Sequence, residues 1–500
     1  MSAARTLIRF PGRGRSTPPP PASVAVDAGD VAYRHHHLYV NGEGTWAVFV
    51  LGEVDAVNRP PHVLEALVEA QAHRWAALAG RRVRLWGLPL AFPHVAFVER
   101  MHSEFPDHAR GDAGRAAQFE EMQERKAAFA RLIGARQLVP VLAVQVTSGQ
   151  TPREYLPLLL RAERCPDRLG VIEAARQELR QITASVARPG WGARPVSEAG
   201  LTWALRVSRT PGFPAPSARL DRWDAFTEAA GFGDAPRVTA AEFGPHVTVR
   251  GIRDGREVTR YATTLRVDDI ESGRDTDDVV PWLAWLDSLG PTGDDDSGWR
   301  VQWAADFRMV GGREQRRKAA WRLKLTREIA RHYDDHGADE DRQIARAADR
   351  AEDIVDEVAG KPHVAVRGVG HVTVTVSAET IDGLQTAVES VIDAAAEEQG
   401  MTLVQGGGQW ADYRRSIVGN HWDSVGHELP LPAPFLAAGV PNLSAAAGDA
   451  AGFMCGPIAG SNSVYVFNAL DGPRHGKAWV WVINGAQGAG KTTTAVAIAA

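Results

Sequence analysis

The chain has 500 residues and a formal net charge of -5, and 44% of its residues are hydrophobic and 23% are charged. These values are ordinary for a folded protein, and the length predicts about three domains. The nearly balanced charge excludes a chain-wide attraction to nucleic acid. The two cysteines, Cys165 and Cys455, exclude a disulfide framework and a thiolate zinc site, and they favour a reducing cytoplasm.

The N-terminal residues 1–27 form a basic, proline-rich segment. Four arginines precede the proline run at 18–21, and no apolar stretch reaches the length of a signal peptide. We expect this segment to be a disordered tail. No window of the chain holds the roughly 18 consecutive apolar residues that cross a bilayer, so any membrane association is expected to come through partners.

A first α/β unit is predicted over residues 28–188. Strands at 31–40 and 45–51 flank the turn Asn41-Gly42-Glu43-Gly44, a pattern typical of a hairpin. Apolar residues repeat on one face of a predicted helix at 61–79. The remaining elements are expected to be a strand at 83–88, a helix at 114–133, a strand at 138–146 and two helices between 152 and 187.

A proline-rich stretch at 189–236 predicts a loop-rich linker, which separates the first unit from a second α/β unit at 237–430. Its strands are expected at 247–249, 261–267, 301–307 and 364–376. Valine and threonine alternate at 372–376, which is the period of a half-buried strand. Ser377 is placed to cap the next helix. The apolar stripe of that helix is expected to comprise Ile381, Leu384, Val388 and Val391.

The predicted helical region at 313–358 changes charge sign along its length. Basic residues come first and acidic residues follow. Two antiparallel helices broken near His336-Gly337 would set the basic arm against the acidic arm as a solvated hairpin with ion pairs. The alternative is a surface for DNA or for a partner protein.

Histidine and tryptophan often mark functional sites, but here both receive structural interpretations. The histidines at 35–37 are adjacent on a predicted strand, so their side chains alternate faces and cannot converge on one metal. Three further histidines open valine-rich strands: His246, His363 and His371. Three tryptophans fall on apolar helix faces and are expected in the core: Trp75, Trp282 and Trp285.

The last part of the chain, residues 431–500, contains a complete phosphate-binding motif. Residues 478–484 read Ala-Trp-Val-Trp-Val-Ile-Asn, a buried-strand pattern, and residues 485–492 follow as Gly-Ala-Gln-Gly-Ala-Gly-Lys-Thr. This is the full G-x-x-x-x-G-K-[ST] pattern of a P-loop. The apolar residues 493–500 are compatible with a helix, so the motif lies between a strand and a helix, which is the context that confirms it.

Each residue type in the motif suits the binding of ATP or GTP with Mg2+. Its glycines let backbone N–H groups point at phosphate oxygens, and the following helix directs its positive end at the same phosphates. Lys491 and Thr492 are the predicted catalytic residues, because the lysine charge suits the β- and γ-phosphates and the threonine hydroxyl suits Mg2+. Thr493 is expected to reach the α-phosphate. The predicted nucleotide-binding residues are Gly485, Ala486, Gln487, Gly488, Ala489, Gly490, Lys491, Thr492 and Thr493.

A P-loop ATPase needs further parts besides this motif. A later strand ends in an acidic residue that holds Mg2+ and polarises water. Eight residues follow Thr492, so we expect these parts to lie beyond the sequence given. The chain by itself is therefore not expected to hydrolyse ATP at a useful rate.

The stretch that leads into the motif, residues 456–492, resembles the conjugation ATPases of type IV secretion systems, especially the actinobacterial ones. It runs through Val-Tyr-Val-Phe-Asn-Ala-Leu-Asp-Gly-Pro-Arg-His-Gly-Lys before the nucleotide strand. The resemblance implies mixed α/β N-terminal domains followed by the beginning of a RecA-like motor domain. In that domain residues 465–467 and Asp471-Gly472 would form a hairpin before the nucleotide strand.

The resemblance also implies a biological setting. The family's proteins use ATP and Mg2+, assemble as hexamers and dock on the secretion channel and its coupling proteins at the cytoplasmic face of the cell membrane. They energise pilus assembly or DNA transfer, so any DNA contact would be indirect. Lys491 and Thr492 match the family's phosphate and Mg2+ positions.

Two other functions are compatible with the motif. One is a DNA translocase of the FtsK or HerA kind, and the other is a regulatory module that binds nucleotide without turnover. An acid after an apolar strand and a downstream arginine would favour a motor. A GTP-specificity motif such as N-K-x-D would favour a switch.

Overall fold

The computed structural model describes the following residues: 33–41, 43–52, 61–91, 120, 124, 136–146, 169–188, 190–213, 237–240, 244–253, 256–270, 282–286, 298–311, 324, 366–420, 428–442, 453–457 and 464–467. The predicted tail at 1–27 lies outside them. So do nearly all of the predicted helices at 114–133 and 313–358, of which three helical positions are described: Glu120, Glu124 and Lys324.

One large sheet dominates the fold. Its strands are β1 Tyr33–His35, β2 Leu38–Asn41, β3 Gly44–Val50, β4 Arg82–Ala91, β5 Arg136–Val146, β6 Arg194–Pro195, β7 Arg237–Ala240, β8 Val247–Arg253, β9 Arg256–Ile270, β10 Arg300–Val310, β11 Arg367–Ala378, β12 Met401–Gln405 and β13 Leu429–Pro432. The main path is β1-β2-β3-β5-β4-β10-β11-β9-β8-β7, with β6, β12 and β13 paired to β3, β9 and β11. Each of the strand pairs described in it is antiparallel.

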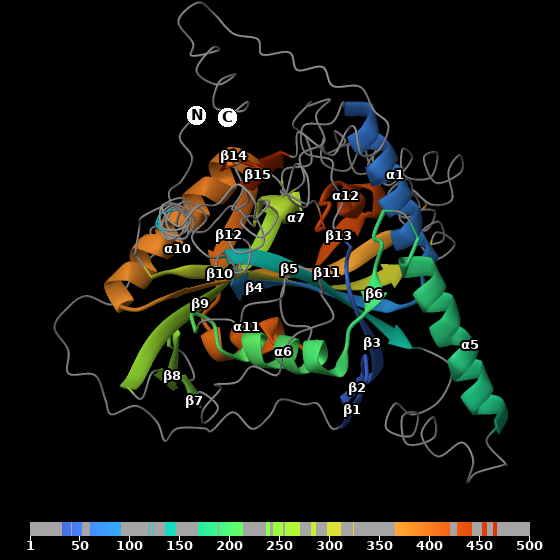
Figure 1. The fold of residues 1–500 in the computed structure, drawn as a ribbon, viewed down its shortest axis with the longest axis horizontal. Coiled ribbons are helices and arrows are strands. Elements are labelled where there is room, and N and C mark those ends of the chain that lie inside the picture. Colours follow the sequence, from blue (N-terminus) through green and yellow to red (C-terminus); the bar gives the residue numbers. More distant parts are fainter. Residues whose placement is uncertain are drawn as a thin grey trace, which may run out of the picture.

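Helices cover both faces of this sheet. They are α1 Pro61–Ala77, α5 Leu169–Val186, α6 Glu198–Arg209, α7 Trp282–Trp285, α10 Ile381–Gln399, α11 Gln409–Ser416 and α12 Ala433–Ala438. Figure 1 shows the sheet across the centre, with α1, α7, α10 and α12 on one side and α6 and α11 on the other. None of the helices described is both long and apolar enough to cross a bilayer. The fold is therefore a mixed α/β one built on a large antiparallel sheet.

Alternation along the strands sends apolar side chains to both faces. Val83 and Leu85 of β4 join the core under α1 and α10, whereas Trp86 joins the core under α6. The predicted half-buried strand at 372–376 is in fact buried on both faces, and Thr375 hydrogen bonds to Thr264 at 3.0 Å between the hydroxyl oxygens. The threonine face is buried because α11 packs over β9 and β11.

The predicted hairpin at the first turn is confirmed. Asn41 pairs with Gly44 at the end of the β2–β3 ladder, and the buried Asn41 side-chain oxygen accepts the backbone N–H groups of Glu43 and Gly44. Gly44 has φ of 147°, a region that favours glycine. The tryptophans Trp75 and Trp282 lie in the core as predicted.

The expected linker at 189–236 contains a helix, which corrects the loop prediction. Ser197 caps α6 by accepting the Gly200 N–H, and buried residues of α6, including Leu201 and Trp203, pack on the sheet. The signal was present, because Ser197 precedes apolar residues with helical spacing; the prolines downstream of α6 obscured it. Strands from either side of this segment also share the sheet, since β4 pairs with β10 along residues 82–87.

Four local expectations are wrong in detail. Thr380, not Ser377, caps α10 by accepting the Gly383 N–H, because Ser377 is still part of β11 and bonds to the Arg300 carbonyl. Ile381 is 45% exposed and does not belong to the buried stripe of α10. The histidines at 35–37 do not share one strand, because the chain turns at 36–37 between β1 and β2. His371 lies inside β11 and does not open it.

Candidate functional site

The residues predicted to bind nucleotide, 485–493, lie outside the described residues. The structure describes a hairpin upstream of them, in which β14 Phe453–Pro457 pairs with β15 Val464–Phe467. The predicted residues 465–467 are thus in a strand, paired with the preceding segment. Asp471-Gly472 lie outside the described residues, so the expected pairing through them stays a prediction.

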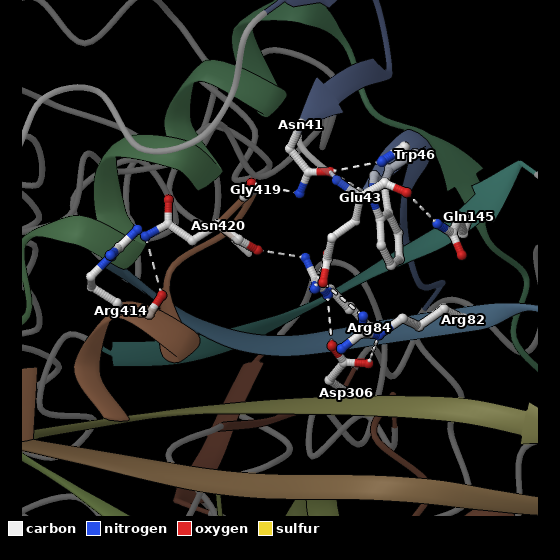
Figure 2. A network of polar contacts seen from close by, with 11 residues as sticks. Asn41, Glu43, Trp46, Arg82, Arg84, Gln145, Asp306, Arg414, Gly419 and Asn420 are labelled. Carbon is white, nitrogen blue, oxygen red and sulfur yellow. Dashed lines mark hydrogen bonds and ion pairs between the residues drawn. The ribbon is translucent and has the colours of Figure 1, made fainter. Parts of the chain in front are cut away.

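A closed ring of alternating charges is the most concentrated polar site that the structure describes (Figure 2). We call its four members, Glu43, Arg82, Arg84 and Asp306, the charge ring. Arg84 of β4 and Asp306 of β10 are direct register partners, and the Arg84 Nε donates to Asp306 Oδ2 at 2.9 Å. Arg82 donates through Nε to Asp306 at 2.8 Å and through Nη1 to Glu43 at 2.7 Å. Arg84 also bonds Glu43, which closes the ring.

The ring is placed by the pleat of the sheet. Arg82 and Arg84 are two residues apart on β4, so both side chains emerge on the face that α6 covers. Glu43 is at the β2–β3 turn, which Asn41 holds in shape. The Arg84 side chain is fully buried, whereas 28% of the Arg82 side chain is exposed, so Arg82 marks the solvent side of the ring.

Burial and the neighbouring charges shift the pKa of two buried groups at this site, Arg84 and Tyr39. Burial opposes the charge of Arg84, but the carboxylates of Asp306 and Glu43 outweigh that cost and raise its pKa. The guanidinium also lies 4.4 Å from the ring centroid of Trp46, a cation–π contact. Burial raises the pKa of the Tyr39 phenol far above its usual value, so Tyr39 is neutral. Arg84 is therefore permanently charged at physiological pH.

The ring also holds the chain that follows α11. Arg84 Nη1 donates to the Asn420 carbonyl at 2.7 Å, and the Asn41 amide donates to the Gly419 carbonyl at 2.9 Å (Figure 2). These two bonds join residues more than 300 positions apart in the sequence. These bonds hold the segment at 419–420 against strands β2 and β4.

The charge ring has a structural role. Each of its four carboxylate oxygens accepts a guanidinium N–H, so neither Glu43 nor Asp306 offers an oxygen outside the ring for use as a base or metal ligand. Charges of opposite sign alternate and cancel. The arrangement is therefore better suited to holding together strands from distant parts of the chain than to catalysis.

A second buried polar centre lies on α11, around the carboxylate of Asp412. Asp412 accepts a hydrogen bond from Arg415 at 2.7 Å, and Arg266 lies 3.7 Å away. Burial raises the pKa of Asp412, while the two arginines oppose that shift. Gly406 permits this approach, because a Cβ there would lie 2.1 Å from the Asp412 Oδ2. This group fastens α11 beside β9.

A third polar centre joins the end of the sheet layer to α1, and we call it the Asn442 node. The buried Asn442 amide donates to the carbonyls of Gly52 at 2.7 Å, Gly190 at 3.1 Å and Trp191 at 3.3 Å. Its oxygen accepts the Gln71 amide at 2.7 Å, and the same amide donates to Gly190. The node fixes the point from which the chain continues toward the predicted motif.

Replacing Asn442 by alanine is expected to lower the free energy of unfolding by about 1 to 3 kcal/mol, because three buried carbonyls and the Gln71 amide lose a partner. Urea denaturation would measure the change. Gln385→Ala is the control, because the bond from Gln385 to Glu389 is exposed and its loss should change stability by less than about 0.5 kcal/mol. Equal losses in both variants would contradict the assignment.

None of the three polar centres was predicted from the sequence. A weak signal for the charge ring existed, because Arg84 and Asp306 are charged residues in strands whose opposite face is apolar. No comparable pattern announces Asn442. In the part of the chain that the structure describes, no three histidine, cysteine or acidic residues gather as a metal site.

Comparison with known proteins adds no relative: no family model and no curated protein matches this chain.

Proposed function

We propose that this chain is the ATP-binding subunit of a machine for conjugative DNA transfer or type IV secretion, with a P-loop motor domain in the last part of the chain. The observation that carries the proposal is the unbroken motif at 485–492, set between an apolar strand pattern and a helix-compatible stretch. The RecA-like fold of that domain is part of the proposal.

Each group of the motif would make its own contact with ATP or Mg2+. Backbone N–H groups of the glycine-rich loop would surround the phosphates of ATP, and Lys491 would place its charge on the β- and γ-phosphates. The hydroxyl of Thr492 would serve as a ligand of Mg2+, which supplies charge neutralisation when bound. Lys491 carries the only positive charge within the loop itself.

The large sheet would serve as the platform of this machine. The Asn442 node and the buried packing of α12 hold the chain on this sheet up to residue 442, and the proposed nucleotide domain would follow. In the proposed setting the full-length protein forms a hexamer and docks on the secretion channel at the inner face of the cell membrane, reached through its partners. DNA contact would be indirect.

Replacing Lys491 by alanine is expected to weaken Mg-ATP binding at least about tenfold, because a charge-assisted bond to phosphate is lost. Equilibrium binding of a fluorescent ATP analogue to the chain would measure it, with Mg2+ present and absent. Thr492→Ala should mainly reduce the gain in affinity that Mg2+ provides.

Lys477→Ala is the matched control, because Lys477 precedes the nucleotide strand and lies outside the motif. It should bind ATP as the wild type does. A chain that stays folded but retains no purine nucleotide would refute the proposal. Tight binding without turnover in a protein that includes the whole domain would support the regulatory module instead of the motor.

A further inference from the structure

At one flank of the molecule α5 packs against α1, and each of these two elements contributes an arginine that no acid neutralises in the part of the chain that the structure describes (Figure 1). Arg74 is in the last turn of α1, and Arg188 follows the end of α5. The turn after Arg188 is fastened to α1, because the Gly190 carbonyl accepts the Gln71 amide at 2.9 Å. A Cβ on Gly190 would lie 3.3 Å from the Ala70 backbone, one helical turn before Arg74.

The support beneath this pair is rigid. Trp75, the neighbour of Arg74, is fully buried and meets Trp191 edge to face with 5.1 Å between ring centroids. The Asn442 amide holds the carbonyls of Gly190 and Trp191 from the other side. The backbone that carries both arginines is therefore fixed by buried packing and hydrogen bonds on two sides.

The pair has an excess of positive charge. Burial lowers the pKa of Arg74, and the positive charge of Arg188 lowers it further. The Arg74 Nε is shielded from solvent and has no hydrogen-bond partner. Within the described ranges, no carboxylate pairs with either guanidinium, whereas Arg82 and Arg84 of the charge ring are each bonded to two acids.

Two like charges held together are unfavourable unless an anion lies between them. Guanidinium groups present forked N–H donors that match the oxygens of a phosphate. We propose that Arg74 and Arg188 form a binding site for a phosphate group, carried either by an anionic lipid headgroup or by a free phosphate compound. This site is separate from the predicted P-loop and requires no nucleotide there.

The test uses the chain with Lys491→Ala throughout, so that the P-loop does not contribute phosphate binding. In that background Arg74→Gln with Arg188→Gln is compared with the parent and with a control that loses the same charge, Arg250→Gln with Arg308→Gln. The control arginines are exposed on β8 and β10. Thermal melting confirms that each variant is folded.

Two probes distinguish the phosphate sources. Inorganic pyrophosphate is titrated by calorimetry, and vesicles of phosphatidylglycerol with phosphatidylcholine are compared with vesicles of phosphatidylcholine alone by co-sedimentation. Each arginine near an anionic surface contributes about fivefold to the affinity for that surface. The double variant is therefore expected to bind the anionic vesicles about 25-fold more weakly than the parent and the control do. A loss confined to vesicles assigns a lipid headgroup, and a loss of pyrophosphate binding assigns a free phosphate compound. The proposal is overturned if the parent binds neither probe, or if the double variant binds as tightly as the control.

Discussion

Replacing Asp306 by alanine is expected to lower the free energy of unfolding by about 3 to 5 kcal/mol. Asp306 is 2% exposed and accepts hydrogen bonds from both Arg82 and Arg84. Its removal leaves two positive charges with one carboxylate, and the Arg84 side chain is fully buried. The loss of stability is large because the variant leaves a buried positive charge without its partner. The free-energy cost of that unpaired charge exceeds the net stabilisation that the intact ion pair provided. Urea denaturation followed by circular dichroism would measure the loss.

Two further variants make this test specific to the charge ring. Asp268→Ala removes an exposed aspartate from β9 and should change stability by less than about 0.5 kcal/mol. Arg84→Met combined with Asp306→Leu removes both members of the central pair, and Glu43 and Arg82 remain bonded to each other. The double variant should therefore recover at least half of the loss. If the Asp306→Ala variant were as stable as the wild type, the charge ring would not stabilise the fold.

Replacing Trp75 by alanine is expected to cost a similar amount, about 3 to 5 kcal/mol, through the loss of buried area and the cavity that remains. Trp75 is fully buried in α1 and contacts two aromatic rings edge to face, Trp191 at 5.1 Å and Phe307 at 6.1 Å between centroids. It therefore joins α1 both to the sheet and to the turn after α5. Chemical denaturation with tryptophan fluorescence would report the change.

Trp285→Ala is the appropriate comparison for Trp75→Ala. Trp285 is half-buried, and its indole N–H donates to Glu398 at 2.5 Å in an exposed bond. Its removal should cost clearly less than the removal of Trp75, because less apolar area is lost and water can fill the space. If both variants lost the same stability, Trp75 would not be the anchor of α1.

Local features were predictable because they depend on residues close in sequence. The hairpin at Asn41 is an example, since the asparagine side chain bonds backbone groups two and three residues ahead. The helix at 61–77 and the strands β4, β5, β9 and β10 follow from the period of their apolar residues. The errors at Ser377 and Ile381 are shifts of a few residues at one helix start, where several side chains compete to cap.

The sequence alone determined the class of most elements and the chemistry of one motif, the loop at 485–492 with Lys491 and Thr492, because these depend on short-range spacing. Only the tertiary structure decided that β4 and β10 lie side by side, which brings Asp306 opposite Arg84 across 222 positions. Strand partners and register are chosen by burial and pairing over the whole sheet, so no local pattern specifies them. The charge ring results from that long-range choice, and the Asn442 node likewise joins segments that are distant in the sequence.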